Sequence, residues 1–379
     1  MSAHVPASTS LEAVPQLDLT AQYAAIGAEI RAALERVMAS QQFVLGREGA
    51  ALEQEIAELC GVSHGVGVAS GTDALILALR ACGVKAGDEV LLPPFTFVAT
   101  GSAVSALGAK PVFADIRPDT YNLDPAECAR RVTPRTRAIV VVHLYGLPAE
   151  MDVLLAFAKE RKLPVIEDNA QAIGARYKGR PTGSMGDVGC VSFYPTKNLG
   201  AYGDAGMVVS NSAGLAERLR TLRNHGQTGK YLSSEPGWNS RLDEMQAAIL
   251  RVKLRHLSNW QRARQSNAAE YTRLLNPFPG VMTPHTPEGL EHVFHQYTIR
   301  VEKRDALQKF LAERHIGSAV YYPHPLHLQP IYAELGHKRG DFPHAERAAQ
   351  EVLSLPMYPE LRKEQIARVA ECLQEFISK

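Results

Sequence analysis

Short apolar runs that alternate with helical stretches constrain the fold of this chain most. The runs are rich in Val and Ile and have the length of buried strands: Gly65–Ala69, Glu89–Leu92, Lys110–Ala114, Ala138–Val142, Pro164–Glu167, Val188–Tyr194 and Gly206–Ser210. Helical stretches between them include Ala74–Ala81, Val98–Leu107 and Met151–Arg161. Strands buried on both faces read as continuous apolar runs, and parallel strands need a crossover helix. The pattern predicts an α/β fold with a largely parallel sheet and helices on both faces.

The alternation of buried strands and helices ends near residue 255, where we expect a second domain to begin. A long helix over Leu242–Arg264 is expected to leave the sheet domain. After it, Tyr297–Glu302 alternates like a half-exposed strand, Asp305–Arg314 is amphipathic, and Ile366–Ile377 ends the chain as a helix. The expected parts are a flexible N-terminal tail over residues 1–15, a large domain over 16–255 and a smaller α+β C-terminal domain over 256–379.

The charge balance excludes several classes of partner. The 379 residues include 41 Lys and Arg against 40 Asp and Glu, a formal net charge of +1, and no basic stripe stands out. Nucleic acid and anionic membrane surfaces are therefore not expected as partners. The apolar runs fall short of the roughly 18 residues that span a bilayer, and residues 1–15 lack the basic and apolar regions of a signal peptide.

The cysteines and histidines give no sign of a disulfide framework or a metal site. The five cysteines are scattered, odd in number and never in a C-x-x-C pair, which is typical of free thiols in a reducing cytoplasm. The 13 histidines show no H-x-x-x-H or H-E-x-x-H pattern. We therefore expect a cytoplasmic protein without a metal ion.

An acid and a lysine follow two of the predicted strands. Asp168 closes the run Leu163–Glu167, and Lys197 lies in the loop that follows the run Val188–Tyr194. A lysine can form a Schiff base with the aldehyde of pyridoxal 5′-phosphate, and an acid can pair with the pyridine nitrogen of that cofactor. Alternatively, Asp168 could be a helix N-cap and Lys197 an exposed loop lysine. The flanking Pro195 and Gly200 favour a tightly shaped loop.

Two further segments fit a phosphorylated, flat ligand. Ser70-Gly71-Thr72-Asp73 joins a strand to a helix, where free N–H groups and a glycine favour a phosphate. Ser192 could also donate to that phosphate. Taken alone, the short segment Ser70-Gly71-Thr72-Asp73 is better explained as an ordinary helix cap. Phe97 follows a strand and could stack on a flat ring, although core packing is the alternative.

The ordered set of motifs resembles the sugar aminotransferases of the DegT/DnrJ/StrS family, which use pyridoxal phosphate. That family is a branch of the aspartate aminotransferase superfamily (fold type I). The resemblance extends from about Leu17 to Leu373. Its motifs are S-G-T-D-A-L, P-x-F-T-F-x-A-T, G-A-K-P-V-F-A-D, Y-N-L-D-P, I-E-D-N-A-Q, S-F-Y-P-T-K-N-L-G, G-D-A-G, R-N-H-G-Q and N-S-R-L-D-E-M-Q-A-A-I-L.

The resemblance implies a role for each candidate site residue. Lys197 would be the Schiff-base lysine and proton shuttle, and Asp168 would pair with the pyridine nitrogen. Residues implied to bind the cofactor are Gln171 at the phenolic oxygen, Gly71, Thr72 and Ser192 at the phosphate, Phe97 on the ring and Asn239, which would reach the phosphate from the neighbouring subunit. Residues implied to bind substrate are His225, Arg241, Tyr321, Tyr322 and His324.

The resemblance also implies a reaction. An amino group would pass from L-glutamate, which leaves as 2-oxoglutarate, to the keto carbon of a UDP- or dTDP-linked ketohexose. The motifs most resemble those of enzymes that aminate C-3. Pyridoxamine 5′-phosphate would carry the group, and a homodimer would share two active sites. Related dehydratases carry histidine where this chain keeps Lys197, which favours transamination. Many relatives have His-Tyr-Pro where this chain has Tyr321-Tyr322-Pro323, so the contact with the sugar could differ.

Three alternatives remain open from the sequence. The first is an aminotransferase of the same fold that acts on a 4-keto sugar or a keto-cyclitol. The second is a regulator that binds pyridoxal phosphate without turnover, although no added DNA-binding segment is visible. The third is a dinucleotide-binding protein, for which Gly65-Val66-Gly67-Val68-Ala69-Ser70 lacks the third glycine of G-x-G-x-x-G.

Overall fold

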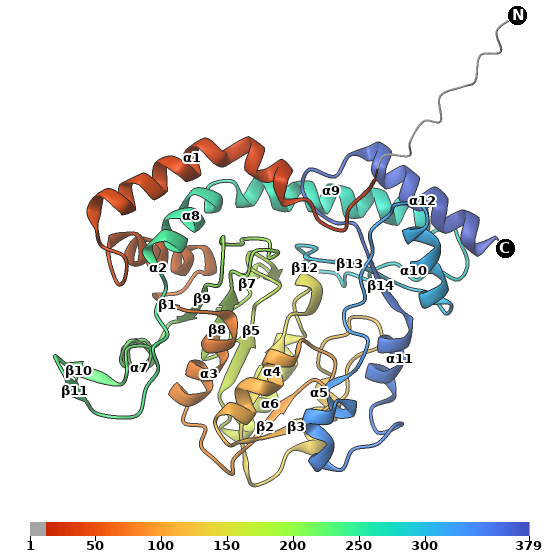
Figure 1. Cartoon of the computed structure of the whole chain (residues 1–379). Helices are drawn as coiled ribbons and strands as arrows, with labels where there is room; N and C mark the ends of the chain where they lie inside the picture. The colour runs from red at the N-terminus through yellow and green to blue at the C-terminus, as the bar shows by residue number, and fades with distance from the viewer. Residues whose placement is uncertain (1–12, 379) are drawn as a thin grey trace, which may run out of the picture.

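Seven strands form the central sheet of the computed structural model, which describes residues 13–378 (Figure 1). They are β1 (His64–Val68), β2 (Glu89–Leu92), β3 (Lys110–Phe113), β4 (Thr136–Val142), β5 (Val165–Asp168), β8 (Val188–Ser192) and β9 (Gly206–Ser210). Their order is β1-β9-β8-β5-β4-β2-β3. β9 is antiparallel to both of its neighbours, and all other neighbours pair in parallel. The predicted, largely parallel sheet is confirmed.

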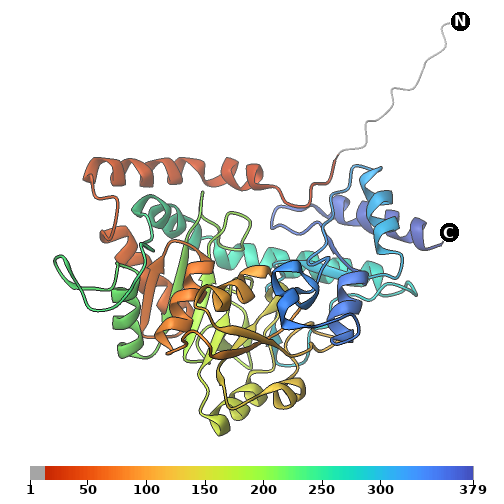
Figure 2. The same ribbon diagram turned by 60° about the horizontal axis from the view of Figure 1, so that its bottom comes forward.

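Helices cover both faces of this sheet (Figures 1 and 2). One face packs against α3 (Gly71–Ala81), α4 (Val98–Ala106) and α7 (Ala213–Leu222). The other face packs against α2 (Arg47–Cys60), α5 (Pro125–Arg131), α6 (Met151–Arg161) and α8 (Glu244–Leu254). Neighbouring strand residues point to opposite faces, so Val140 belongs to the first core and Val141 to the second.

Local chemistry explains where these elements begin. β4 contains Ile139 and three successive valines, and β-branched side chains suit a strand that is buried on both faces. The α3 helix begins at Gly71 because the Ser70 Oγ accepts the N–H of Asp73 at 3.1 Å. The α7 helix begins in the same way, with the Ser212 Oγ accepting the N–H of Leu215.

The C-terminal part of the chain builds a second hydrophobic core. Its elements are α9 (Leu257–Leu275), β13 (Tyr297–Arg300), α10 (Arg304–Ala312), β14 (Val352–Leu355) and α12 (Lys363–Ile377). In contrast, α11 (Pro343–Glu351) packs on the core of the central sheet through Ala345 and Ala348. The chain thus returns to the sheet after it has left it, and a domain boundary at residue 255 stays a prediction.

The N-terminal part of the described chain is anchored on the C-terminal core. Val14 is buried, donates its N–H to the carbonyl of His315 at 2.9 Å and pairs with Ile316. We predicted a flexible tail over residues 1–15, of which residues 1–12 lie outside the described part. The helix α1 (Leu19–Ser40) then runs along α8 (Figure 1).

Two expected elements differ from the structure. The predicted helix Leu242–Arg264 is interrupted at His256, whose carbonyl accepts the N–H groups of Asn259 and Trp260 at the start of α9. The first residue of α9, Leu257, still packs on a core of α8, whereas its later residues Ala268 and Tyr271 pack on the C-terminal core, so tertiary packing overrides the continuous helical pattern. The predicted half-exposed strand is β13, which is buried throughout. Its polar Thr298 is satisfied there by the hydroxyl of Ser354 at 2.8 Å.

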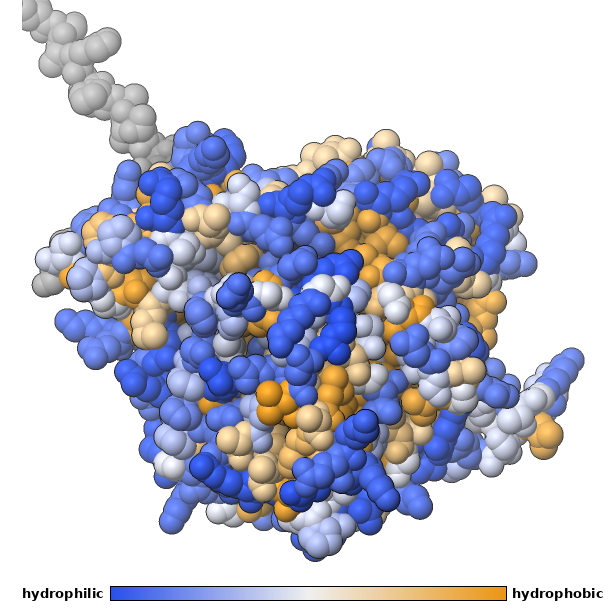
Figure 3. Space-filling model, turned by 180° about the vertical axis from the view of Figure 1, so that it is seen from behind, coloured by the Kyte–Doolittle hydropathy of each residue, from blue (hydrophilic) through white to orange (hydrophobic). Residues whose placement is uncertain are grey.

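Several short strands lie outside the large sheet. β6 (Arg176–Tyr177), β7 (Arg180–Pro181) and β12 (Leu290–Glu291) form one small sheet. β10 (Gln227–Gly229) and β11 (Leu232–Ser233) form a hairpin that stands clear of the body, with Tyr231 89% exposed at its turn (Figures 1 and 3). All five cysteines are free. Within residues 13–378, no helix combines the length and apolar character needed to cross a membrane.

Candidate active site

The predicted acid and lysine lie at the carboxyl ends of neighbouring strands. Asp168 is the last residue of β5, and β8, which pairs with β5, ends at Ser192. The chain then turns, with the N–H of Lys197 bonded to the carbonyl of Tyr194 at 2.8 Å. Ligands of open parallel sheets bind outside the carboxyl ends of the strands. The two residues therefore occupy the place where a ligand is expected.

Asp168 is a buried carboxylic acid with two hydrogen-bond donors. Its side chain is only 5% exposed. The Thr100 hydroxyl donates to Oδ2 at 2.8 Å, and the Ala170 N–H donates to Oδ1 at 3.2 Å. Burial raises the pKa of Asp168 above its ordinary value, and these two bonds and the charge of Lys197 counteract that effect. A cationic group against this carboxylate would be strongly favoured, because it would replace lost solvation.

Lys197 has the amine that covalent catalysis requires. Burial lowers the pKa of Lys197 to about 8, and the negative charge of Asp168 acts in the opposite direction. An amine must be neutral to attack a carbonyl group or to accept a proton. The surroundings of Lys197 therefore make the neutral fraction near neutral pH far larger than that of an ordinary lysine.

A chain of polar contacts connects Gln171 to the predicted substrate loop. The Gln171 Oε1 accepts the N–H of Tyr145 at 2.7 Å, and its Nε2 donates to the Tyr322 hydroxyl at 3.0 Å. The Tyr145 hydroxyl donates to the carbonyl of Tyr321. The ring of Phe97, which is 54% exposed, lies 6.0 Å from that of Tyr322. These contacts bring Gln171, Phe97, Tyr321 and Tyr322 together.

The predicted phosphate-binding residues meet where α3 begins beside the end of β8. A Cβ atom added to Gly71 would lie 2.6 Å from the Cβ of Ser192, so only glycine allows this approach. Thr72 is the next residue of the helix. The first N–H groups of a helix point away from its own hydrogen-bond ladder and attract anions. The structure thus places Gly71, Thr72 and Ser192 at one site.

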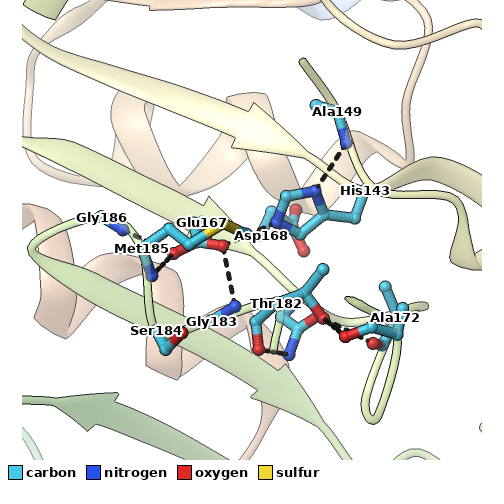
Figure 4. A network of polar contacts seen from close by, with 12 residues as sticks. His143, Ala149, Glu167, Asp168, Ala172, Thr182, Gly183, Ser184, Met185 and Gly186 are labelled. Atoms are coloured by element: carbon cyan, nitrogen blue, oxygen red, sulfur yellow. Dashed lines mark hydrogen bonds and ion pairs between the residues drawn. The ribbon is translucent and has the colours of Figure 1, made fainter. Parts of the chain in front are cut away.

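Glu167, the residue before Asp168, accepts hydrogen bonds from a different set of donors (Figure 4). Glu167 is fully buried and accepts the ring N–H of His143 at 2.8 Å, since the other nitrogen of His143 accepts the N–H of Ala149 at 3.1 Å. Three backbone N–H groups, of Gly183, Met185 and Gly186, complete its shell. Burial alone would raise the pKa of Glu167, but the bond from His143 and these N–H groups lower it. Glu167 thus fixes the strand ends around the site.

Four predicted site residues lie outside this cluster. His225 and Asn239 are exposed, and Arg241 donates to the Asn224 side chain at 3.3 Å. The neighbouring Ser240 is buried and donates to Asp73 on α3 at 2.6 Å. His324 is also exposed, in the loop after Tyr322. No contact among residues 13–378 joins these four side chains to Asp168 or Lys197.

Several residues of the site carried no role in the sequence analysis. Thr100 stands within the motif P-x-F-T-F-x-A-T, and its position in the first turn of a helix after β2 is the signal that could have identified it. His143 and Glu167 lie at the ends of paired strands, which is a weaker signal. Tyr145 binds Gln171 through its backbone N–H, which no side-chain motif can indicate. In the described part of the chain, no three His, Cys, Asp or Glu side chains gather as a metal site.

A family model matches residues 24–374, and its description is the DegT/DnrJ/EryC1/StrS aminotransferase family. This match covers most of the chain and agrees with the lysine, the acid and the anion site at the ends of the strands. The chain therefore belongs to the DegT/DnrJ/EryC1/StrS aminotransferase family, as the motifs predict.

Curated relatives extend over almost the whole chain. A UDP-N-acetyl-3-dehydro-α-D-glucosamine 3-aminotransferase of Acidithiobacillus ferrooxidans is 49% identical, over 97% of this chain and 99% of that protein. A dTDP-3-amino-3,4,6-trideoxy-α-D-glucose transaminase of Streptomyces venezuelae is 47% identical, over 96% of both. A Geobacillus stearothermophilus protein with the name pleiotropic regulatory protein is 53% identical, over 96% of this chain and 98% of that protein.

Solved structures share the fold. DesV of S. venezuelae in complex with a ketimine intermediate matches with a TM-score of 0.95 and 47% identity, over 97% of this chain and 99% of that chain. NtdA of Bacillus subtilis with bound cofactor PMP matches with a TM-score of 0.88 and 30% identity, over 100% of this chain and 86% of that chain. The predicted fold type I architecture and the predicted enzyme class, an aminotransferase, are confirmed.

Pyridoxal phosphate, the predicted cofactor, is the cofactor of this family, and the residues of this chain fit it. Asp168 is a buried acid, and no cationic side chain within residues 13–378 is bonded to it. Lys197 has a pKa lowered to about 8. Because position 71 is a glycine, the start of α3 lies close to Ser192, and the start of a helix favours a phosphate. Each of these features suits one chemical group of the cofactor.

Proposed function

We propose that this aminotransferase moves an amino group from L-glutamate to the C-3 keto carbon of a nucleotide-linked ketohexose during the biosynthesis of an amino sugar. The observation that carries the proposal is the buried Asp168 beside Lys197, whose pKa is lowered to about 8, at the ends of paired strands. Support for C-3 comes from two relatives whose names give a 3-dehydro or a 3-amino sugar. Either UDP or dTDP would serve as the nucleotide.

Pyridoxal phosphate, when bound, supplies an electron sink and carries the amino group between the two halves of the reaction. In the first half, glutamate loses its amino group and leaves as 2-oxoglutarate. In the second half, the sugar ketone accepts that group and its oxygen leaves as water. The protein has to hold the ring, keep its nitrogen protonated and move one proton in each direction.

In this proposal, Lys197 moves that proton. Its Nζ takes the proton from the α-carbon of glutamate, and in the second half it returns a proton to C-3 of the sugar. A pKa near the working pH is favourable for both directions, because the same group has to accept and donate. Asp168 would hold the ring nitrogen, Gln171 the phenolic oxygen, and Phe97 one face of the ring.

A second copy of the chain would complete each site. Ser240 points into its own subunit, where it binds Asp73, whereas the adjacent Asn239 is exposed. Adjacent residues of an extended segment point in opposite directions, so Asn239 faces outward. We infer that Asn239 reaches the cofactor phosphate of a partner subunit, and that Arg241 and His225 meet the substrate there. Tyr321, Tyr322 and His324 would contact the sugar nucleotide from the subunit that holds the lysine.

One alternative function has its own support. The relative from G. stearothermophilus has a name that describes regulation, which agrees with a protein that binds pyridoxal phosphate without turnover. An acceptor other than a 3-keto sugar, such as a 4-keto sugar or a keto-cyclitol, is the other alternative. Amino transfer from glutamate separates the first alternative from the proposal, and the identity of the product separates the second.

The test is a panel of acceptors with a matched inactive variant. Purified protein with pyridoxal phosphate and L-glutamate would be mixed with UDP- and dTDP-linked 3-keto and 4-keto hexoses and with a keto-inositol. We expect one 3-amino sugar nucleotide, identified by mass and NMR, in an amount equal to the 2-oxoglutarate formed. The Lys197→Ala variant should form none. Amination of the 4-keto sugar or the inositol alone, or no glutamate-dependent product, would refute the proposal.

A further inference from the structure

His295 is a buried histidine beside the lysine loop to which neither the motifs nor the reaction assign a role. It lies between β12 and β13 and is 5% exposed. Its Nδ1 lies 3.3 Å from the Oδ1 of Asn198, the residue that follows Lys197. Asn198 is buried and donates its Nδ2 to the carbonyl of Val293 at 3.1 Å. Two hydrogen bonds therefore join the loop after β8 that contains Lys197 and Asn198 (the lysine loop) to the short segment 292–296 of the C-terminal part.

The bond pattern fixes the proton on the imidazole. The Asn198 amide nitrogen is occupied by the Val293 carbonyl, so its Oδ1 is free to accept and the His295 Nδ1 donates. In the neutral ring the Nε2 then carries no proton. No side chain among residues 13–378 forms a hydrogen bond with that nitrogen.

The charges around His295 keep it neutral. Burial lowers the pKa of His295 well below its ordinary value. The charges of Lys197, on the loop, and Arg264, on α9, act in the same direction, as does His292 on the same segment. Arg264 also donates to the carbonyl of Phe294 at 3.1 Å. His295 can therefore support Lys197 without adding a positive charge beside it.

The same segment also bonds to the turn Leu144–Gly146, which orients Gln171 and is called the Gln171 turn below. The Val293 N–H donates to the carbonyl of Gly146 at 3.1 Å, and the Gln296 N–H donates to the carbonyl of Tyr145 at 3.3 Å. Tyr145 in turn donates its N–H to Gln171. The two sides of the predicted cofactor site, the lysine loop and the Gln171 turn, are thus held by one segment.

We propose that His295 is a positioning residue for Lys197, and that it acts through Asn198 to hold the lysine loop against the Gln171 turn. The inference rests on the role of Lys197 in the proposed function. Lys197 is partly exposed, and without this tie the loop would loosen and more water would reach the lysine, so the desolvation that favours its neutral form would decrease. Two consequences follow that do not require turnover: the pKa of Lys197 should rise, and its reactivity toward an amine reagent should fall.

The test measures the reactivity of Lys197 in the full-length, cofactor-stripped protein. Competitive labelling with an amine-reactive reagent across pH 6–11, read by peptide mass spectrometry, gives the titration curve of that single amine. In His295→Leu we expect the midpoint to rise by about one pH unit, so that labelling at pH 8 falls about fivefold. In His295→Asn, whose amide nitrogen can replace the Nδ1 donor, we expect a curve close to that of the original protein.

Two further variants keep the test decisive. His292→Leu removes a buried histidine of the same segment that bonds to the Phe294 N–H and not to the lysine loop, and its Lys197 curve should be unchanged. Asn198→Ala removes both hydrogen bonds between the lysine loop and the segment, so it should shift the midpoint at least as far as His295→Leu, and adding His295→Leu to it should give no further shift. Equal shifts in the His295 and His292 leucine variants, or no shift in either His295→Leu or Asn198→Ala, would overturn the inference.

Failure of the proposed function would give a different result. Borohydride reduction of the original holoenzyme, followed by peptide mapping, should leave the cofactor tag on Lys197. A tag on another residue would refute the role of Lys197 itself. A tag on Lys197 combined with an unshifted His295→Leu curve would refute only the positioning role of His295.

Discussion

At the scale of single residues, the site depends on the ionisation of one carboxylic acid. Asp168 is buried, and its pKa lies above the ordinary value because of that burial. The Thr100 hydroxyl donates to it at 2.8 Å and favours the charged form. A carboxylate that pairs with a cationic ring has to stay ionised at the working pH. If Asp168 pairs with the cofactor ring as proposed, the Thr100 hydroxyl extends cofactor binding to lower pH, because it lowers the pKa of Asp168.

We expect Thr100→Val to shift the pH dependence of cofactor binding upward. Valine keeps the shape but removes the donor, so the pKa of Asp168 should rise further. Since the carboxylate is lost as pH falls through its pKa, cofactor affinity should begin to fall at a higher pH, by about one unit for a hydrogen bond to a charged group. A fluorescence titration of pyridoxal phosphate binding from pH 4.5 to 8 measures the midpoint.

Thr96→Val is the matched control for this prediction. The Thr96 hydroxyl lies 3.0 Å from that of Thr100 but does not touch Asp168. Its removal leaves the bond between Thr100 and Asp168, so the midpoint should move much less. Equal midpoints in the original protein and Thr100→Val would show that the hydroxyl does not support the charge of Asp168.

At the scale of elements, the proposed phosphate site depends on how closely α3 approaches β8. Gly71→Ala would place a Cβ 2.6 Å from the Cβ of Ser192. The helix start and the strand end would have to move apart, and the N–H groups would no longer converge with the Ser192 hydroxyl. We expect the dissociation constant of pyridoxal phosphate, measured by calorimetry on stripped protein, to rise at least about tenfold.

Gly214→Ala provides a comparison within another helix. Gly214 lies in the first turn of α7, where the nearest atom to an added Cβ would be the Ser212 Oγ at 4.0 Å. This substitution should leave the cofactor affinity unchanged. The interpretation of Gly71 as a phosphate residue is wrong if Gly71→Ala binds the cofactor as tightly as Gly214→Ala does.

Elements with strong local signals could be predicted from the sequence. The β2 strand matches the run Glu89–Leu92, and α6 matches the stretch Met151–Arg161. A strand buried on both faces needs a continuous apolar run, and the helix that connects two such parallel strands has to lie in the stretch between them. Asp168 and Lys197 could be identified from the sequence for the same reason, because each comes at or after the end of an apolar run that is easily recognised.

Features that depend on tertiary contacts were not accessible in this way. The interruption at His256 lets the later turns of α9 pack on the C-terminal core, while α8 and Leu257 pack on a core beside the central sheet. The burial of β13 arises from its pairing with β14, which the sequence analysis did not predict. The contact between His295 and Asn198 joins residues 97 positions apart. No local pattern contains such information.

At the scale of the whole molecule, the proposed dimer predicts that subunits can complement each other. Lys197→Ala would inactivate the site that contains the lysine, and Asn239→Ala combined with Arg241→Ala would damage the site of the partner. A mixed dimer of these two variants has one intact site. After unfolding and refolding together, the mixture should regain about one quarter of the original activity, since half of the dimers are mixed.

A second mixture makes this prediction specific. Lys197→Ala and Asp168→Asn both alter the cluster within one subunit, so a mixed dimer of these variants has no intact site. That mixture should stay inactive under the same refolding protocol. Recovery in the second mixture, or none in the first, would show that the sites are not shared as proposed.

The tie between Asn198 and the segment around His295 has a consequence for how the molecule is made. During synthesis, β5, which ends with Asp168, and the loop that carries Lys197 leave the ribosome well before the segment that braces them. Until that segment arrives, the nascent chain holds the reactive amine on a loop with one side unsupported. Vitamin B6 would therefore be captured late, after the last third of the polypeptide has emerged and folded back.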